Sequence, residues 1–313
     1  MIETRYYEVA GHRFCVSGGE DIFTLMHNYE PFRLHQTTPV GGELFALSIG
    51  DGETVNYVEE LRQEDEGQVI VCGHTSAGEA VFEFLSPVGS RRPEAERQWC
   101  GATAAWLVCS VGYRQGRLVT TGKYTKMAVD NALMVMFALA TADKGTVLFH
   151  ASVVGYKGRG YMFLGSSGTG KSTHASLWLR AYPQTVHEGG MSANGGAELV
   201  NDDNPVVRLA DDGSAVVYGS PWSGKTPCYR NVSFPLGGIV VLRQAPHNKI
   251  RRLSGICAYA ALVESISGKR WDKRIADGLH RTENWLASNV AMWHLECLPD
   301  EAAARLSNET IVS

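Results

Sequence analysis

Several features are missing from this chain of 313 residues, and each absence narrows the class of protein. The first residues, Met1 to Arg5, lack the apolar core of a signal peptide. The longest apolar stretch, residues 132–142, is too short to cross a bilayer and predicts a buried helix that begins near Thr125. The seven cysteines are odd in number, and no two of them have C-x-x-C spacing. We therefore expect a cytoplasmic protein with reduced thiols and no membrane partner.

The chain also lacks an excess of positive charge. Lys and Arg number 29 against 33 Asp and Glu, so the net charge is −4. Proteins that bind nucleic acid usually carry clustered basic residues, and we expect no nucleic acid partner here. Hydrophobic residues make up 44% of the chain, which is ordinary for a globular protein and sufficient for a substantial core.

The most informative segment that is present is G-S-S-G-T-G-K-S at residues 165–172, which has the G-x-x-x-x-G-K-S pattern of a phosphate-binding loop. Its glycines permit a tight turn whose backbone N–H groups can face a polyphosphate. Lys171 can reach the β- and γ-phosphates of ATP, and the Ser172 hydroxyl can ligate Mg²⁺. An apolar run that predicts a strand precedes the loop, and a helical pattern follows it. Phosphate binding needs this order of strand, loop and helix. The residues expected to bind the nucleotide are Gly165, Ser166, Ser167, Gly168, Thr169, Gly170, Lys171, Ser172 and Thr173.

Two adjacent carboxylates, Asp202 and Asp203, follow a short apolar strand. In phosphoryl transfer one carboxylate can hold Mg²⁺ and the other can accept the proton of an attacking hydroxyl. The alternative is a plain turn, because Asp, Asn and Pro favour turns and Pro205 follows closely. The similar pair Asp211 and Asp212 stands before a glycine between two β runs, and it predicts a hairpin turn without chemistry.

Four further residues are candidates for the same site. His150 at the start of a strand can face the phosphates, or it can be a hydrogen-bonded histidine of the sheet. In the turn at residues 219–225, Trp222 can wall a pocket and Lys225 can neutralise phosphate charge, or the turn can be a surface turn with an anchoring Trp. Arg230 is a candidate for a phosphate contact. The glycine-rich loop at residues 187–196 predicts either a lid or a loop without a fixed role.

The chain divides by character into three parts. Paired apolar runs separated by turn residues predict a β-rich N-terminal domain over residues 1–125. Residues 126–145 predict a connecting helix, and residues 146–313 a nucleotide-binding domain with the phosphate loop. Residues 146–156 predict one long strand, and the short turn after it predicts an antiparallel partner that ends at Gly165. The fold class expected is α/β or α+β with a mixed sheet.

The ordered set of motifs resembles the HPr serine kinase/phosphorylase and phosphoenolpyruvate carboxykinase superfamily, in its compact kinase-like branch. The set is H-A-S-V-V at 150–154, the loop at 165–172, N-D-D at 201–203 and S-P-W-S-G-K at 220–225, and the resemblance covers about residues 145–300. It implies a P-loop core of the carboxykinase type. It also implies that His150 lies before the loop, that Asp202 binds metal and that Asp203 acts as the base. The N-terminal part matches neither group.

The function implied by this resemblance is an ATP- and Mg²⁺-dependent kinase that transfers the γ-phosphoryl group to a hydroxyl of a protein or peptide serine, or of a small metabolite. The acidic metal ligand that follows the aspartates in HPr kinases has no counterpart here, so HPr itself is not the expected acceptor. Carboxykinases are longer and carry Lys, His and Arg residues that we cannot place. A carboxykinase-like enzyme and a non-catalytic nucleotide-binding regulatory protein remain alternatives, and the oligomeric state, a homo-oligomer included, is left open.

Overall fold

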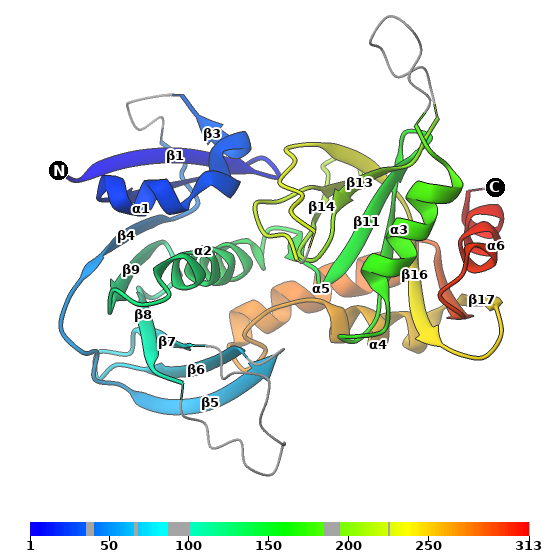
Figure 1. Cartoon of the computed structure of the whole chain (residues 1–313). Coiled ribbons are helices and arrows are strands. Elements are labelled where there is room, and N and C mark those ends of the chain that lie inside the picture. The colour runs from blue at the N-terminus through cyan, green and yellow to red at the C-terminus, as the bar shows by residue number, and fades with distance from the viewer. Residues whose placement is uncertain (36–40, 66–67, 87–100, 185–194, 225, 313) are drawn as a thin grey trace, which may run out of the picture. The chain divides into compact units, whose positions relative to one another are not determined.

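The structure is a computed structural model that describes residues 1–35, 41–65, 68–86, 101–184, 195–224 and 226–312 (Figure 1). Contacts within the chain divide it into two units, Met1–Ala140 and Thr141–Ser313. Each unit combines helices with a large mixed sheet, so the chain is of the mixed α/β class, compatible with α+β. The helix expected as a connector is α2 (Thr125–Thr141), and nearly all of it belongs to the first unit.

The first unit is built on a nine-stranded sheet with the order β3-β1-β2-β4-β9-β8-β7-β6-β5. Most neighbours are antiparallel, whereas β4 is parallel to both β2 and β9. The strands are β1 (Glu3–Val9), β2 (His12–Gly18), β3 (Arg33–Leu34), β4 (Ala46–Asp51), β5 (Val58–Asp65), β6 (Gln68–His74), β7 (Ala80–Leu85), β8 (Thr103–Cys109) and β9 (Gln115–Thr120). The helices are α1 (Glu20–Leu25), the 3-10 helix His27–Phe32 and α2.

Aromatic side chains join the sheet of the first unit to helix α2. The ring of Phe14 stacks on Phe45 at 4.9 Å between centroids and meets Phe137 of α2 edge-on at 6.5 Å. Leu133 and Met136 of the same helix are buried as well. Each such side chain contributes about 1.5–3 kcal/mol when it leaves water, so the apolar stretch of α2 is accounted for by packing within this unit.

The second unit has its own nine-stranded sheet, in which β10-β14-β15-β16-β12-β11-β13 form one path and β18 and β17 extend it from β16. Strand β12 is antiparallel to β11 but parallel to β16, which confirms the predicted mixed sheet. The strands are β10 (Thr146–Leu148), β11 (Ala151–Tyr156), β12 (Arg159–Leu164), β13 (Glu198–Asn201), β14 (Val206–Leu209), β15 (Ala215–Tyr218), β16 (Ser233–Gln244), β17 (Lys249–Leu253) and β18 (Met292–Cys297). The helices are α3 (Lys171–Ala181), α4 (Gly255–Ser265), α5 (Lys273–Asn289) and α6 (Glu301–Ile311).

The expectation of a single strand over residues 146–156 is wrong, because the chain changes partners in the middle. Strand β10 pairs with β14, whereas β11 pairs with β12 and β13. Between them Phe149 N donates to Pro205 O and His150 N donates to Ser265 O, at 3.0 and 2.8 Å. This break places His150 at the start of β11 rather than inside a continuous strand.

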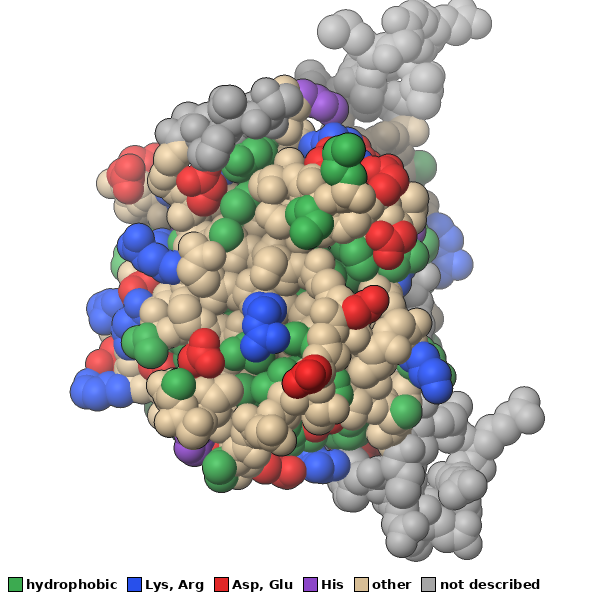
Figure 2. Space-filling model, turned by 90° about the vertical axis from the view of Figure 1, so that its left-hand side faces the viewer, with side chains coloured by type: hydrophobic (Ala, Val, Ile, Leu, Met, Phe, Trp, Pro, Cys, Tyr) green, Lys and Arg blue, Asp and Glu red, His purple; other side chains and the backbone are tan. Residues whose placement is uncertain are grey.

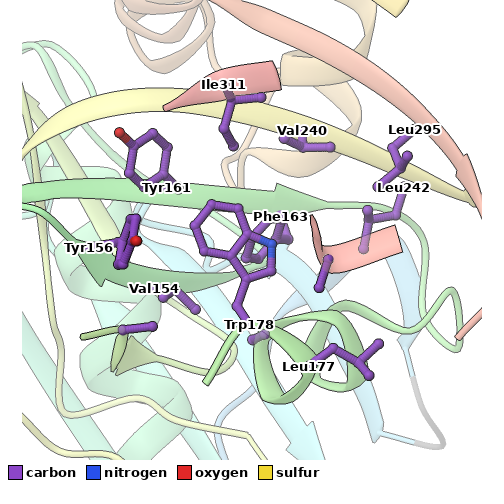
Figure 3. Packing of buried hydrophobic residues seen from close by; sticks show 13 residues of the cluster. Val154, Tyr156, Tyr161, Phe163, Leu177, Trp178, Val240, Leu242, Leu295 and Ile311 are labelled. Carbon is purple, nitrogen blue, oxygen red and sulfur yellow. The ribbon is translucent and has the colours of Figure 1, made fainter. Parts of the chain in front are cut away.

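Helix α3 is anchored to the sheet of the second unit by Trp178, which is fully buried. Figure 3 shows its indole ring directed from α3 toward Phe163 and Tyr161 of β12, with ring centroids at 5.4 and 5.6 Å. The indole Nε1 donates to Ser307 Oγ of α6 at 2.9 Å, so the ring also binds the C-terminal helix. Helix α3 is therefore held rigidly at the end of β12, where the glycine loop begins.

Four segments come together at one edge of this sheet. Strand β12 ends at Leu164, which pairs with Ala151 at the start of β11 and with Val241 near the end of β16. Val153 of β11 pairs with Asn201 at the end of β13. The glycine loop after β12, the residue before β11 and the residues after β13 and β16 consequently meet at the same edge.

Candidate active site

The loop between β12 and α3 has the backbone that its glycines were expected to allow. Gly165, Gly168 and Gly170 have φ of 153°, 77° and 104°, a region that residues with a side chain rarely adopt. Thr169 N donates to Ser166 O at 3.2 Å and closes the turn. Gly170 directly precedes α3 and, as a glycine, has no side chain with which to cap this helix end. The first turn of a helix has N–H groups without intrahelical partners, and together with the helix dipole they attract anions.

Lys171 places a positive charge on this loop. Its Nζ donates to Gly165 O at 2.9 Å and to Ser166 O at 3.4 Å, and the residue is only 8% exposed. A buried ammonium group is costly unless it is hydrogen-bonded, and the two carbonyls supply such bonds. The amine is thus held over the loop, where an anion bound to the backbone N–H groups would meet it.

Asp202 has a carboxylate with one oxygen bound and one oxygen without a partner. Ser152 Oγ donates to its Oδ1 at 3.1 Å, while its Oδ2 is buried and has no hydrogen-bond partner among the described residues. Asp202 is 4% exposed. An ionised carboxylate in such surroundings is stabilised by a cation, and a carboxylate oxygen is a ligand that a hard metal ion such as Mg²⁺ prefers.

Asp203 differs from its neighbour in being open to solvent. Its side chain is 33% exposed, and its Oδ1 lies 3.3 Å from Nε2 of His150. The backbone of Asp203 is held on both sides, since its carbonyl accepts from Ala151 N and its N–H donates to Asn201 Oδ1 at 2.9 Å. The two aspartates therefore have different environments, one buried and one within reach of a ligand.

Asn201 organises this segment, a role that we did not predict. Its Nδ2 donates to Ser220 Oγ and to Trp222 O, at 3.1 and 3.0 Å, which ties the Ser-Pro-Trp turn to the aspartates. A Cβ added to Gly224 would lie 3.1 Å from Cβ of Asp203, so the turn also packs closely against the exposed aspartate. The only signal in the sequence is that Asn201 directly precedes the two aspartates.

Two more supporting side chains lie outside the predicted set. Gln244 Nε2, at the end of β16, donates to Gly168 O of the glycine loop at 3.0 Å. Ser152 of β11 holds Asp202, as described above. Ser152 belongs to the H-A-S-V-V motif at 150–154, although no role was predicted for it, whereas Gln244 belongs to no recognised motif and only strand pairing brings it to the loop.

The remaining predicted residues differ in where the structure places them. Trp222 is buried. The guanidinium of Arg230 donates to Leu199 O at 2.6 Å and to Glu198 Oε2 at 2.5 Å, which binds it to β13. Lys225 and most of the loop at 187–196 lie outside the described residues. Phosphate contacts by these groups stay predictions.

His174 on α3 lies beside the loop, and burial lowers its pKa to about 4. Its ring contacts Phe163 edge-on at 4.7 Å, and its Nε2 lies 3.0 Å from Ser307 Oγ. The histidine is therefore uncharged at neutral pH.

This burial predicts a loss of stability in acid. The folded pKa of His174 is lower than the ordinary value of 6.5, so the stabilisation is complete above pH 6.5 and is lost as the pH falls toward 4. The full effect is about 3 kcal/mol, and at pH 4.5 most of it is gone. Urea unfolding at pH 7 and pH 4.5 measures it. His174→Gln does not titrate in this range and should lose less stability than the wild type on acidification. An equal loss in both proteins would contradict the prediction.

Away from this edge of the sheet, the described residues form no second site of comparable chemistry. A depression of about 770 Å³ in the first unit is lined in part by Lys126 and Asp130, which form an ion pair at 2.8 Å. In the described part of the chain, no three His, Cys, Asp or Glu side chains cluster as a metal site, and no helix is long and apolar enough to cross a membrane. On the face in Figure 2, acidic and basic side chains are interspersed.

The chain matches no protein-family model, and it has no significant match among curated proteins. The functional assignment is consequently argued from the geometry of the site.

Proposed function

We propose that the second unit is a P-loop phosphotransferase, an ATP- and Mg²⁺-dependent kinase that transfers the γ-phosphoryl group to a hydroxyl. The observation that carries this proposal is the meeting of three groups at one sheet edge. They are the glycine loop with Lys171, the buried Asp202, whose Oδ2 has no hydrogen-bond partner among the described residues, and the partly exposed Asp203 beside His150. The acceptor hydroxyl belongs to a protein or peptide serine or to a small metabolite.

The phosphate-binding part of the proposal assigns the polyphosphate to the loop and the N-terminus of α3. Backbone N–H groups and Lys171 would orient the phosphates and offset their charge. Ser172, exposed on the first turn of α3, and Asp202 would hold Mg²⁺. When bound, this ion supplies additional neutralisation of phosphate charge.

The acceptor part of the proposal assigns proton transfer to Asp203. A carboxylate that accepts the proton of a hydroxyl must be reachable by the acceptor, and the side chain of Asp203 is 33% exposed whereas Asp202 is buried. His150 lies 3.3 Å from Asp203 and would orient this carboxylate. The base is thereby held against the loop edge, where a γ-phosphoryl group would be presented.

The mixed sheet and the order of the motifs support a core of the HPr-kinase and carboxykinase type, and the free thiols of the six described cysteines support a reducing, cytoplasmic location. Neither feature identifies the acceptor.

A labelling experiment tests the proposal. The purified full chain is incubated with γ-labelled ATP, Mg²⁺ and a lysate of its source cells, which is then separated into protein and small-molecule fractions. We expect label in one fraction with the wild type and none with Lys171→Ala, because that variant lacks the phosphate lysine. The labelled fraction gives the acceptor class.

Two other outcomes would replace the proposal. ATP binding without transfer to any fraction would favour a non-catalytic regulatory protein. Formation of phosphoenolpyruvate from oxaloacetate and ATP with Mn²⁺ would favour a carboxykinase-like enzyme.

A further inference from the structure

We infer that the cavity between the glycine loop, the end of β16 and the segment after β18 binds the base of the nucleotide. The inference rests on the proposed function, which supplies the triphosphate but leaves the position of the base unspecified. The cavity measures about 500 Å³, within the range of roughly 300–1,000 Å³ that is usual for small-molecule sites.

None of the described residues that line this cavity is Asp, Glu, Lys or Arg, so they bring no carboxylate, ammonium or guanidinium charge to it. Leu177, Leu242, Cys297 and Leu298 supply apolar surface. A polyphosphate or a sugar acid would find no countercharge on these walls. A flat, neutral heterocycle fits them, because it can bury its faces against aliphatic side chains.

The polar groups of the cavity lie on the side of the loop. Gly168, Thr169, Gly170 and Thr173 form part of its wall, so the cavity is continuous with the phosphate site. Gln244 also lines it and donates to Gly168 O at 3.0 Å. A base in this cavity and phosphates on the loop would consequently belong to one ligand.

The wall opposite the loop is well supported. Ala245 N donates to Cys297 O at 3.1 Å, and Leu298 N donates to Asn248 Oδ1 at 2.8 Å. These bonds join the chain after β16 to the chain after β18. The cavity is thus bounded by two segments whose strands pair in the sheet, not by an isolated loop.

A substitution that fills the cavity distinguishes binding of the nucleotide base from binding of the phosphates. Ala245→Phe retains the backbone bond of Ala245 and adds a ring to the wall. Calorimetry of the full chain with Mg²⁺ should show ATP affinity reduced at least about tenfold, with the affinity for inorganic tripolyphosphate nearly unchanged. The matched control is Ala260→Phe, a substitution at an exposed alanine of α4, which should leave both affinities unchanged.

Unchanged ATP affinity in Ala245→Phe, with tight binding by the wild type, would overturn the base site and leave the proposed function intact. Failure of the wild type to bind either ATP or tripolyphosphate would instead overturn the proposed function and this inference together.

If Ala245→Phe binds neither ATP nor tripolyphosphate, a measurement on the wild type tests the base site instead. Cys297 lines the cavity, whereas Cys257 is exposed on α4 and serves as an internal reference. ATP should slow alkylation of Cys297 by iodoacetamide, measured by mass spectrometry, and tripolyphosphate should not. Equal alkylation of Cys297 with ATP and with tripolyphosphate would overturn the base site.

Discussion

Replacing Lys171 by alanine is expected to weaken ATP binding at least about 100-fold, or about 2.7 kcal/mol, and to reduce phosphoryl transfer below detection. The amine is buried and donates to the carbonyls of Gly165 and Ser166, so its charge is already held at the loop before a phosphate binds. Hydrogen bonds between a cation and a phosphate are about twice as strong as neutral ones. Calorimetry with Mg²⁺ and ATP measures the binding, and the labelling assay measures transfer.

Two further variants test whether the loss of ATP binding is specific to the amine of Lys171. Lys249→Ala removes an exposed lysine of β17 and should leave ATP binding unchanged. Lys171→Arg keeps the charge but replaces a compact ammonium by a planar fork, and should also bind ATP poorly. ATP affinity of Lys171→Ala within about threefold of the wild type would contradict a phosphate-binding role for this loop.

Replacing Asp203 by asparagine is expected to slow phosphoryl transfer while ATP binding is retained. Asn has nearly the same shape, and the backbone N–H at this position can still donate to Asn201 Oδ1. The amide cannot accept a proton from the attacking hydroxyl, and loss of a general base typically costs about 10²–10⁴ in rate. ATP affinity should stay within about threefold of the wild type while transfer falls by at least about 100-fold.

The matched control for Asp203→Asn is Asp211→Asn, in the turn between β14 and β15. This turn is the predicted hairpin, in which Asp212 Oδ1 accepts from Ser214 N at 2.9 Å and Gly213 has a φ of 78°. Asp211→Asn should leave transfer unchanged. Full turnover in Asp203→Asn would show that another group takes the proton, and Asp202 or His150 would then be the next candidates.

The local order of the second unit could be predicted from the sequence because it depends on short-range chemistry. Three glycines within the six residues before Lys171 specify a turn with positive φ, and the helical pattern that follows specifies α3. The apolar stretch of α2 predicts a buried helix for the same kind of reason, since a helix that is apolar on nearly all sides is stable only where it is buried. The mixed sheet followed from the short turn between β11 and β12.

Other features depend on contacts between residues far apart in the chain, and these the sequence could not reveal. The expected strand over residues 146–156 is divided because β10 and β11 have different partners. Asn201 binds the turn at Trp222 through a hydrogen bond between residues far apart in the chain, and Gln244 joins the site only through the pairing of β12 with β16. No local pattern encodes such pairings.

By itself, therefore, the sequence determined the turn of the glycine loop, the helix after it, the pair of carboxylates and the class of fold, because glycine conformation, helix periodicity and charge are properties of neighbouring residues. Only the tertiary structure decided that Asp202 is buried, with one oxygen that no described residue binds, while Asp203 is partly exposed beside His150. Adjacent residues at the end of a strand point to different sides, and which side is buried depends on what the rest of the chain packs there.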